Sequence, residues 1–123
     1  MSKKFKILSI DDSKAVHAFL KDCSSELALS FSSVFNGAEA IELLTNNINQ
    51  FDVIFLDWEM PIKDGPTTFN ELKKLGLKTP VFMLTSKNNP EDIMKMIEAG
   101  VMDYLMKPFT KEIIQEKILQ NLG

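Results

Sequence analysis

Five short apolar runs, separated by longer amphipathic segments, constrain the fold of this chain more than any other feature. Each run is almost continuously hydrophobic, and apolar and polar residues do not alternate along it. Strands that are covered on both faces, as in a parallel sheet between two layers of helices, have this character. We therefore predict five strands, at residues 5–10, 31–35, 51–56, 80–84 and 103–106.

The segments between the runs carry helix signals. Apolar side chains fall on one helical face of residues 14–27, and Asn36 followed by Glu39 resembles a capping box that opens a helix through about residue 45. Later starts are marked by Gly65-Pro66, by Asn89-Pro90 and by Thr110, and a glycine at position 100 ends the fourth helix. Strand and helix therefore alternate five times.

This (βα)5 pattern predicts an α/β fold in which right-handed crossovers build a doubly wound, five-stranded parallel sheet. With 123 residues the chain has the size of one domain, which we place at residues 1–123. Since the last predicted element is the fifth helix, we expect no output domain. Sheets of this class bind their ligands in the crevice outside the carboxyl ends of the strands.

Polar residues that carry chemistry follow four of the five runs. Asp11 and Asp12 come after the first, Asp57 after the third, Thr85 after the fourth and Lys107 after the fifth. A buried carboxylate costs free energy unless it is paired or has a function. Because the carboxyl ends of parallel strands meet at one edge, we predict an acidic pocket with one cation. Such a pocket suits a divalent metal and a phosphoryl group.

The composition excludes several functions. All fourteen basic residues are lysines, which argues against sequence-specific binding of nucleic acid, where arginine is the commonest reader of bases. No apolar stretch is long enough to cross a membrane or to form a signal peptide. The single cysteine, Cys23, allows no internal disulfide, which fits a reducing compartment. We therefore expect a cytoplasmic protein.

The motifs and their order resemble the receiver domain of bacterial response regulators, above all the small stand-alone chemotaxis regulators of the CheY type. The resemblance spans the whole chain and implies the strand order 2-1-3-4-5. The motifs that carry it are Ile10-Asp11-Asp12-Ser13, Asp57-Trp58-Glu59-Met60-Pro61, Asp64-Gly65, Leu84-Thr85-Ser86 and Tyr104-Leu105-Met106-Lys107-Pro108-Phe109.

The resemblance implies a role for each pocket residue. Asp57 would be the phosphoacceptor, which attacks the phosphohistidine of a partner histidine kinase. Asp12, Asp57 and the backbone carbonyl of Glu59 would bind Mg²⁺, and Asp11 would bind it through a water. Lys107 would pair with Asp57 at rest and with a phosphoryl oxygen afterwards, and the bond that links it to Pro108 would be cis.

The same resemblance implies a switch. Thr85 would move its hydroxyl toward the phosphoryl group, Tyr104 would turn inward, and the surface of the fourth helix, fifth strand and fifth helix would bind a downstream protein. A flagellar motor switch is one such target. The phosphoryl group would leave by hydrolysis in the same pocket. We expect a monomer that binds neither nucleic acid nor membrane.

Four further residues carry expectations of their own. Glu59 and Lys87 place an acid and a base at the pocket mouth, and we predict that they pair and modulate dephosphorylation. We expect His17, which adjoins the apolar face of the first helix, to lie on the helix surface, where kinases dock in this family. Cys23 falls on the apolar face itself and should be a buried, inert thiol.

Three alternatives stay open from the sequence. Within the family, the chain could be a phosphorelay carrier that passes its phosphoryl group to a second histidine protein. From another class, Asp57-x-Glu59 superficially provides the two acids of a haloacid dehalogenase-type phosphatase, although no cap for substrate recognition is present. A flavin-binding flavodoxin-like module is a third, although acids stand where its phosphate loop would follow the first strand.

Overall fold

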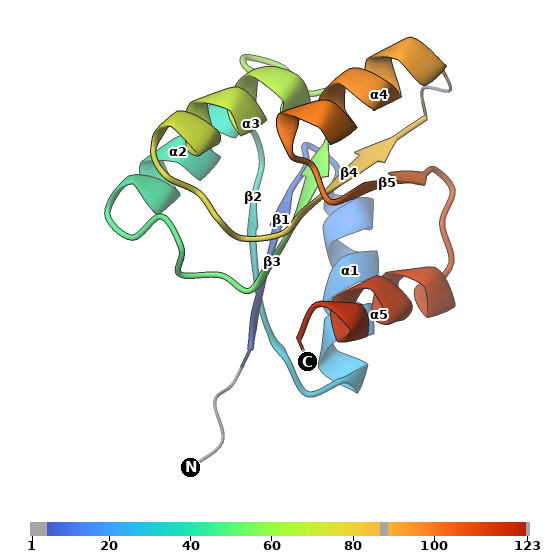
Figure 1. Ribbon diagram of the computed structural model, residues 1–123. Coiled ribbons are helices and arrows are strands. Elements are labelled where there is room, and N and C mark those ends of the chain that lie inside the picture. Colours follow the sequence, from blue (N-terminus) through green and yellow to red (C-terminus); the bar gives the residue numbers. More distant parts are fainter. Residues whose placement is uncertain (1–4, 87–88, 123) are drawn as a thin grey trace.

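The protein is described by a computed structural model that covers residues 5–86 and 89–122. Its centre is one parallel sheet of five strands in the order β2-β1-β3-β4-β5 (Figure 1). This is the strand order that the sequence predicted. The strands are β1 (Lys6–Ile10), β2 (Ser30–Val34), β3 (Val53–Asp57), β4 (Val81–Thr85) and β5 (Asp103–Met106).

Helices cover both faces of the sheet. In Figure 1, α1 and α5 lie on one side, and α2, α3 and α4 lie on the other. Each strand is joined to the next through one helix, which confirms the doubly wound (βα)5 fold. The helices are α1 (Lys14–Glu26), α2 (Gly37–Thr45), α3 (Gly65–Lys74), α4 (Pro90–Ala99) and α5 (Lys111–Gln120).

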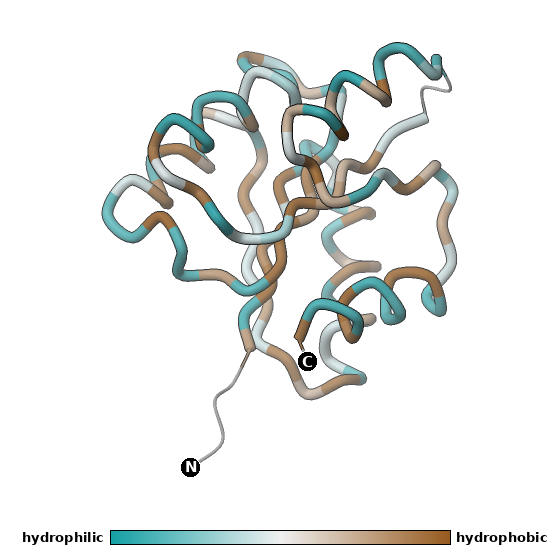
Figure 2. The backbone as a smooth tube through the Cα atoms, in the orientation of Figure 1, coloured by the Kyte–Doolittle hydropathy of each residue, from teal (hydrophilic) through white to brown (hydrophobic). Residues whose placement is uncertain are grey.

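Two hydrophobic cores result, one on each face of the sheet. Along β3, Val53 and Phe55 belong to the core under α1 and α5, whereas Ile54 and Leu56 belong to the core under α2, α3 and α4. Successive strand residues point to opposite faces, so a strand buried on both sides must be apolar at every position. Figure 2 shows this as hydrophobic colour along the central strands.

The predicted helix ends are confirmed at most positions. Asn36 accepts a hydrogen bond from the amide of Glu39, whose carboxylate accepts from the amide of Phe35, one residue before the cap; the arrangement is a variant of the capping box. Thr110 caps α5 through the amide of Ile113. Gly100 ends α4 with φ of 117°, a left-handed conformation that favours glycine.

Strand boundaries differ from the prediction by one or two residues. Phe35 is not part of β2, because the Glu39 side chain takes its amide hydrogen. β3 begins at Val53. The preceding residue, Asp52, still donates its amide to the carbonyl of Lys6, but the amide of Lys6 bonds to the side chain of Asp52 and not to a backbone carbonyl. In the described part of the chain, none of the helices is long and apolar enough to span a membrane.

Candidate functional site

The strand register brings the predicted site residues to one edge of the sheet. Asp57 ends β3 and pairs with Leu84, while Thr85 ends β4 and pairs with Met106, the last residue of β5. Asp11 and Asp12 follow β1, and Lys107 follows β5. A pocket of about 190 Å³ opens at this edge, lined by Asp12, Asp57, Trp58, Glu59, Thr85, Ser86 and Lys107. The predicted acidic pocket is therefore present.

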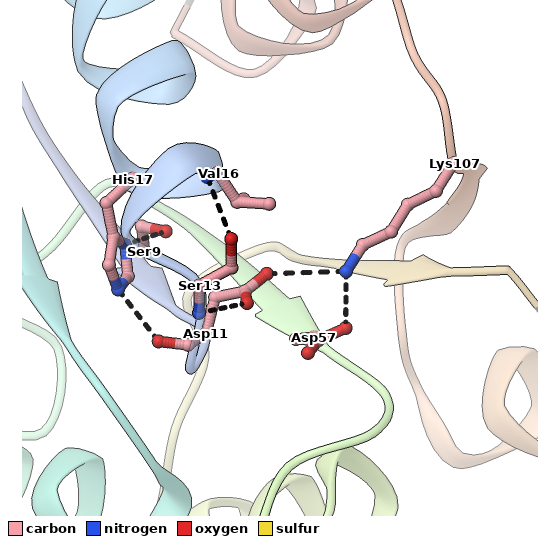
Figure 3. A network of polar contacts seen from close by, with 7 residues as sticks. All are labelled: Ser9, Asp11, Ser13, Val16, His17, Asp57 and Lys107. Atoms are coloured by element: carbon pink, nitrogen blue, oxygen red, sulfur yellow. Dashed lines mark hydrogen bonds and ion pairs between the residues drawn. The ribbon is translucent and has the colours of Figure 1, made fainter.

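Lys107 enters this pocket from the side opposite to Asp11 and reaches both buried acids (Figure 3). Its Nζ donates to Oδ1 of Asp57 at 2.9 Å and lies 3.5 Å from Oδ2 of Asp11. Asp11 is fully buried and Asp57 is only 4% exposed, whereas Asp12 is exposed. One ammonium group thus faces two carboxylates that solvent barely reaches.

This imbalance of charge changes how the two groups titrate. Burial raises the pKa of Asp57 from its ordinary 3.8 to about 6, with a contribution from the negative charge of Asp11, although the hydrogen bond from Lys107 opposes the rise. Burial also lowers the pKa of Lys107, but the hydrogen bond to Asp57 and the charge of Asp11 outweigh it, so that this pKa rises. At neutral pH the pair is therefore ionised, with Asp57 held close to its titration range.

The acids fit a hard divalent cation. Asp11, Asp12 and Asp57 each offer an oxygen, and these oxygens lie within 4.8 Å of one another. Oδ2 of Asp11 is buried and accepts no hydrogen bond from the described residues. Its ion pair with Lys107 at 3.5 Å is shared with Asp57, so one ammonium group does not balance the three carboxylates. A further cation would balance them, and Mg²⁺ takes oxygen ligands of this type. The donor set therefore matches the predicted magnesium site.

The loop that carries Asp11 is held from several directions. The amide of Asp11 donates to the carbonyl of Val34 in β2 at 3.2 Å, and Oδ1 of Asp11 accepts from the amide of Ser13 at 2.9 Å. Ser13 in turn caps α1 by accepting from the amide of Val16. The loop between β1 and α1 is thus ordered by hydrogen bonds on both sides of the acid.

His17 contradicts the sequence prediction. It is not a residue of the helix surface: it is 6% exposed, and both ring nitrogens form hydrogen bonds, to Ser9 and to the backbone carbonyl of Asp11. The helical pattern placed it beside the apolar face, but it could not show that a polar loop packs there. Cys23, by contrast, is buried as predicted, and burial raises the pKa of its thiol.

Gly65 is a site residue to which the sequence analysis gave no role in the site, although it marked a helix start and belonged to the Asp64-Gly65 motif. Its amide donates to the carbonyl of Trp58, and a Cβ at this position would lie 2.5 Å from the carbonyl oxygen of Asp57. Only a residue without a side chain allows α3 to approach the end of β3 so closely. The adjacent Asp64-Gly65 motif in the sequence was the available signal.

Of the remaining predicted residues, Thr85 and Glu59 line the pocket, whereas Tyr104 does not. Thr85 is buried, Glu59 is exposed at the mouth, and Lys107–Pro108 is a cis bond as expected. Tyr104 is 37% exposed and lines a separate surface cavity of about 520 Å³ between β5 and α5. The predicted partner of Glu59, Lys87, lies outside the described residues.

Comparison with known proteins points to one family. Residues 7–119 match the response regulator receiver domain. A chemotaxis protein CheY homolog of Campylobacter jejuni is 30% identical over 96% of this chain and 92% of its own length. The sensor histidine kinase CheAY of Helicobacter pylori is also 30% identical over 94% of this chain, which however spans only 15% of that protein.

Solved structures agree. The receiver domain of the Francisella response regulator 1452 is 32% identical, with a TM-score of 0.86 over 95% of both chains. The Vibrio cholerae chemotaxis protein CheY4, at 24% identity, has a TM-score of 0.86 over 98% of this chain and 100% of its own, which supports the fold alone. On the fold, the acidic pocket and the match over residues 7–119, this chain belongs to the response regulator receiver domain family.

Proposed function

We propose that this receiver domain acts as a single-domain, monomeric response regulator in a chemotaxis-type two-component system, with Asp57 as its phosphoacceptor. Receiver domains are phosphoacceptor signalling proteins that take their phosphoryl group from a histidine kinase, so the phosphatase and flavin-binding alternatives are not retained. The observation that carries the proposal is the cluster of Asp57 with Asp11 and Asp12, in which Lys107 contacts both Asp57 and Asp11.

Asp57 has the properties of the required nucleophile. With a pKa of about 6, it is mostly ionised at neutral pH, and it stands at the floor of a pocket that is open to a donor. One carboxylate oxygen forms a bond to phosphorus while the bond between phosphorus and the kinase imidazole breaks. The electron pair returns to the imidazole nitrogen, and the product is an aspartyl phosphate.

Asp12 and Asp57 are expected to hold Mg²⁺ together with the backbone carbonyl of Glu59, and Asp11 is expected to hold it through a bound water. When bound, Mg²⁺ supplies positive charge where an anionic donor meets an acidic pocket. Lys107 adds a second positive charge, and it can exchange its bond with Asp57 for one with a phosphoryl oxygen. In both states the ammonium group of Lys107 would keep a negatively charged partner.

The switch that follows involves Thr85 and Tyr104. Thr85 lies at the end of β4 beside the pocket, and Tyr104 is exposed on the neighbouring strand, a position from which it can turn inward. The surface around it, on α4, β5 and α5, exposes several large apolar side chains. Such a surface suits a downstream protein partner. These side chains are Met94, Met102, Met106 and Ile113.

The chemotaxis assignment rests on similarity. The chemotaxis protein CheY homolog of Campylobacter is 30% identical to this chain and is matched over 92% of its own length, which supports the proposal. On this basis we propose a flagellar motor switch as the partner. The phosphorelay alternative makes a different prediction, namely transfer of the phosphoryl group to a histidine phosphotransfer protein.

The test is incubation with a small acyl phosphate, with and without Mg²⁺, followed by mass spectrometry. The wild-type protein should gain one phosphoryl group only with Mg²⁺, and Asp57→Asn should gain none. Asp103→Asn, which changes an acid outside the pocket, is the matched control and should react like wild type. Reaction of the Asp57 variant at the wild-type rate would refute the assignment.

A second measurement separates the two roles. Phosphorylated protein is offered a flagellar switch peptide and, separately, a histidine phosphotransfer protein, and peptide binding without transfer would favour the chemotaxis role. The pairing of Glu59 with Lys87 stays a prediction. Glu59→Asn and Lys87→Glu should each change the rate of dephosphorylation, and unchanged decay would dispose of it.

A further inference from the structure

The only histidine of the chain lies next to the acidic pocket without facing it. His17 stands in the first turn of α1, buried between that helix, β1 and the loop that carries Asp11 (Figure 3). Its Nδ1 lies 2.8 Å from Oγ of Ser9, and its Nε2 lies 2.8 Å from the carbonyl oxygen of Asp11. The Phe35 ring packs edge-on against it at 4.9 Å.

These partners determine which ring nitrogen carries the hydrogen. A backbone carbonyl can only accept, so Nε2 must be the donor. In the neutral ring Nδ1 is then an acceptor, and the hydroxyl of Ser9, which is fully buried in β1, can supply the hydrogen. Both nitrogens are satisfied, and Phe35 closes one side. The ring is therefore fixed in one orientation and one tautomer.

The carbonyl that His17 binds belongs to the peptide group that joins Asp11 to Asp12. The orientation of this peptide group sets the directions in which the two acidic side chains leave the backbone. The amide of Asp11 donates to the carbonyl of Val34, and its Oδ1 accepts from the amide of Ser13. The bond from His17 to its carbonyl is therefore the third hydrogen bond that holds this residue. Oδ2 is left facing Lys107, as Figure 3 shows.

We propose that His17 is a positioning residue for the magnesium site, an inference that rests on the function proposed above. Its Nε2–H holds the Asp11–Asp12 peptide group so that both carboxylates converge on that of Asp57. Like charges placed this close repel one another, and a loop free to rotate would separate them. His17 opposes that rotation from outside the pocket, through the backbone and without touching the metal.

The magnitude follows from how partners of metal ligands behave in general. Removal of a group that orients a ligand typically weakens metal binding by about 10-fold to 100-fold. Because His17 acts on the backbone between Asp11 and Asp12, two acids of the magnesium site, we expect about a 10-fold weaker affinity for Mg²⁺ when its donor is lost. A histidine that merely packs in the interior would change stability alone.

The experiment compares two replacements of His17. His17→Leu retains apolar bulk against Phe35 but has no donor, whereas His17→Gln places an amide N–H about as far from the backbone as Nε2. Mg²⁺ alone, without a phosphodonor, is titrated into each protein, and binding is followed by the fluorescence of Trp58, which lines the pocket. The Leu variant should bind about 10-fold more weakly, and the Gln variant should recover most of the difference.

Cys23→Ala is the control for stability, since this residue is buried further along α1 and does not reach the loop. It should lower the midpoint of urea unfolding and leave the affinity for Mg²⁺ unchanged. If His17→Leu behaves in the same way, with normal affinity and lower stability, the residue is only structural and the inference is wrong. If wild-type protein itself fails to bind Mg²⁺, the proposed function fails instead.

A spectroscopic measurement covers the case in which the Leu variant does not fold. As the chain has a single histidine, its ring resonances in a nitrogen-15 spectrum need no assignment. We expect a hydrogen on Nε2, protected from exchange with solvent, and a shift of that resonance when Mg²⁺ is added. A hydrogen found on Nδ1 alone would overturn the inference, because the bond to the Asp11 carbonyl could not then exist.

Discussion

Asp57 should destabilise the protein at neutral pH, and its replacement by asparagine should show by how much. The folded state raises the pKa of this carboxyl from 3.8 to about 6, so between these values the folded protein binds more protons at Asp57 than the unfolded chain does. Stability must therefore fall as the pH rises through this window. Below it Asp57 costs nothing, and above it the cost is complete.

The size of the effect follows from the two values. A difference of one pKa unit corresponds to about 1.4 kcal/mol, so the rise from 3.8 to about 6 gives about 2–3 kcal/mol. Because Asp57 is 4% exposed, solvent screens little of this. The asparagine introduced by Asp57→Asn is an isosteric neutral side chain that can still accept from Lys107, and Lys107 would keep the charge of Asp11 nearby.

The assay is urea unfolding followed by circular dichroism, in the presence of a metal chelator, at a series of pH values. The free energy of unfolding of Asp57→Asn minus that of wild type should grow by about 2–3 kcal/mol between about pH 4 and pH 7. Taking the difference cancels the titration of the groups that do not interact with Asp57, so what is left belongs to Asp57 and its neighbours Lys107, Asp11 and Asp12. Glu98→Gln, which removes a carboxylate from an exposed position, is the control and should give a flat difference. A flat difference for Asp57→Asn, or one that shrinks as pH rises, would refute the reasoning.

Three further predictions test the architecture around the site. Gly65→Ala would place a Cβ 2.5 Å from the backbone oxygen of Asp57, so it should weaken Mg²⁺ binding. Gly76→Ala, whose Cβ would meet no atom within 4 Å, should leave Mg²⁺ binding unchanged. Equal affinities for Mg²⁺ in the two variants would argue against this contact. Lys107→Met leaves a buried carboxylate without its hydrogen-bond donor and should lower the free energy of unfolding by about 1–3 kcal/mol in chelator, with added Mg²⁺ restoring part of the loss, as urea titrations would show. Asn36→Ala removes the cap of α2 and should lower stability by about 1 kcal/mol without changing Mg²⁺ affinity, and a larger loss would mean that this residue does more than cap.

The convergence of distant residues was the part of the site that the sequence could predict. Lys107 and Asp57 are 50 positions apart, yet both follow apolar runs, and parallel strands place such residues at one edge of the sheet. Strand ends were less certain, because competition for single hydrogen bonds decides them. The amide of Phe35, for example, belongs to the capping box of α2 and not to the sheet.

The environment of His17 could not have been predicted from periodicity. The helical pattern of α1 gives the direction of a side chain from the helix axis, but it says nothing of a loop that folds over the helix start. The burial of His17 depends on the carbonyl of Asp11 and the hydroxyl of Ser9, which come from an adjacent strand and loop. The closeness of Gly65 to Asp57 could not be predicted either, because the close approach of two backbone segments leaves no hydrophobic pattern in the sequence.

The groups that cost stability in this domain are the groups that its proposed function needs. Asp57 is held near its titration range, and the buried carboxylate of Asp11 shares the single ammonium group of Lys107 with Asp57. A bound cation would lower the electrostatic free energy of both carboxylates. Mg²⁺ binding would therefore stabilise the folded protein by removing a repulsion that the metal-free protein contains. This works only if the acids cannot relieve their repulsion by moving apart. The hydrogen bonds of His17 and Ser13 to the Asp11 loop, which do not face the pocket, prevent that movement and so keep the site receptive.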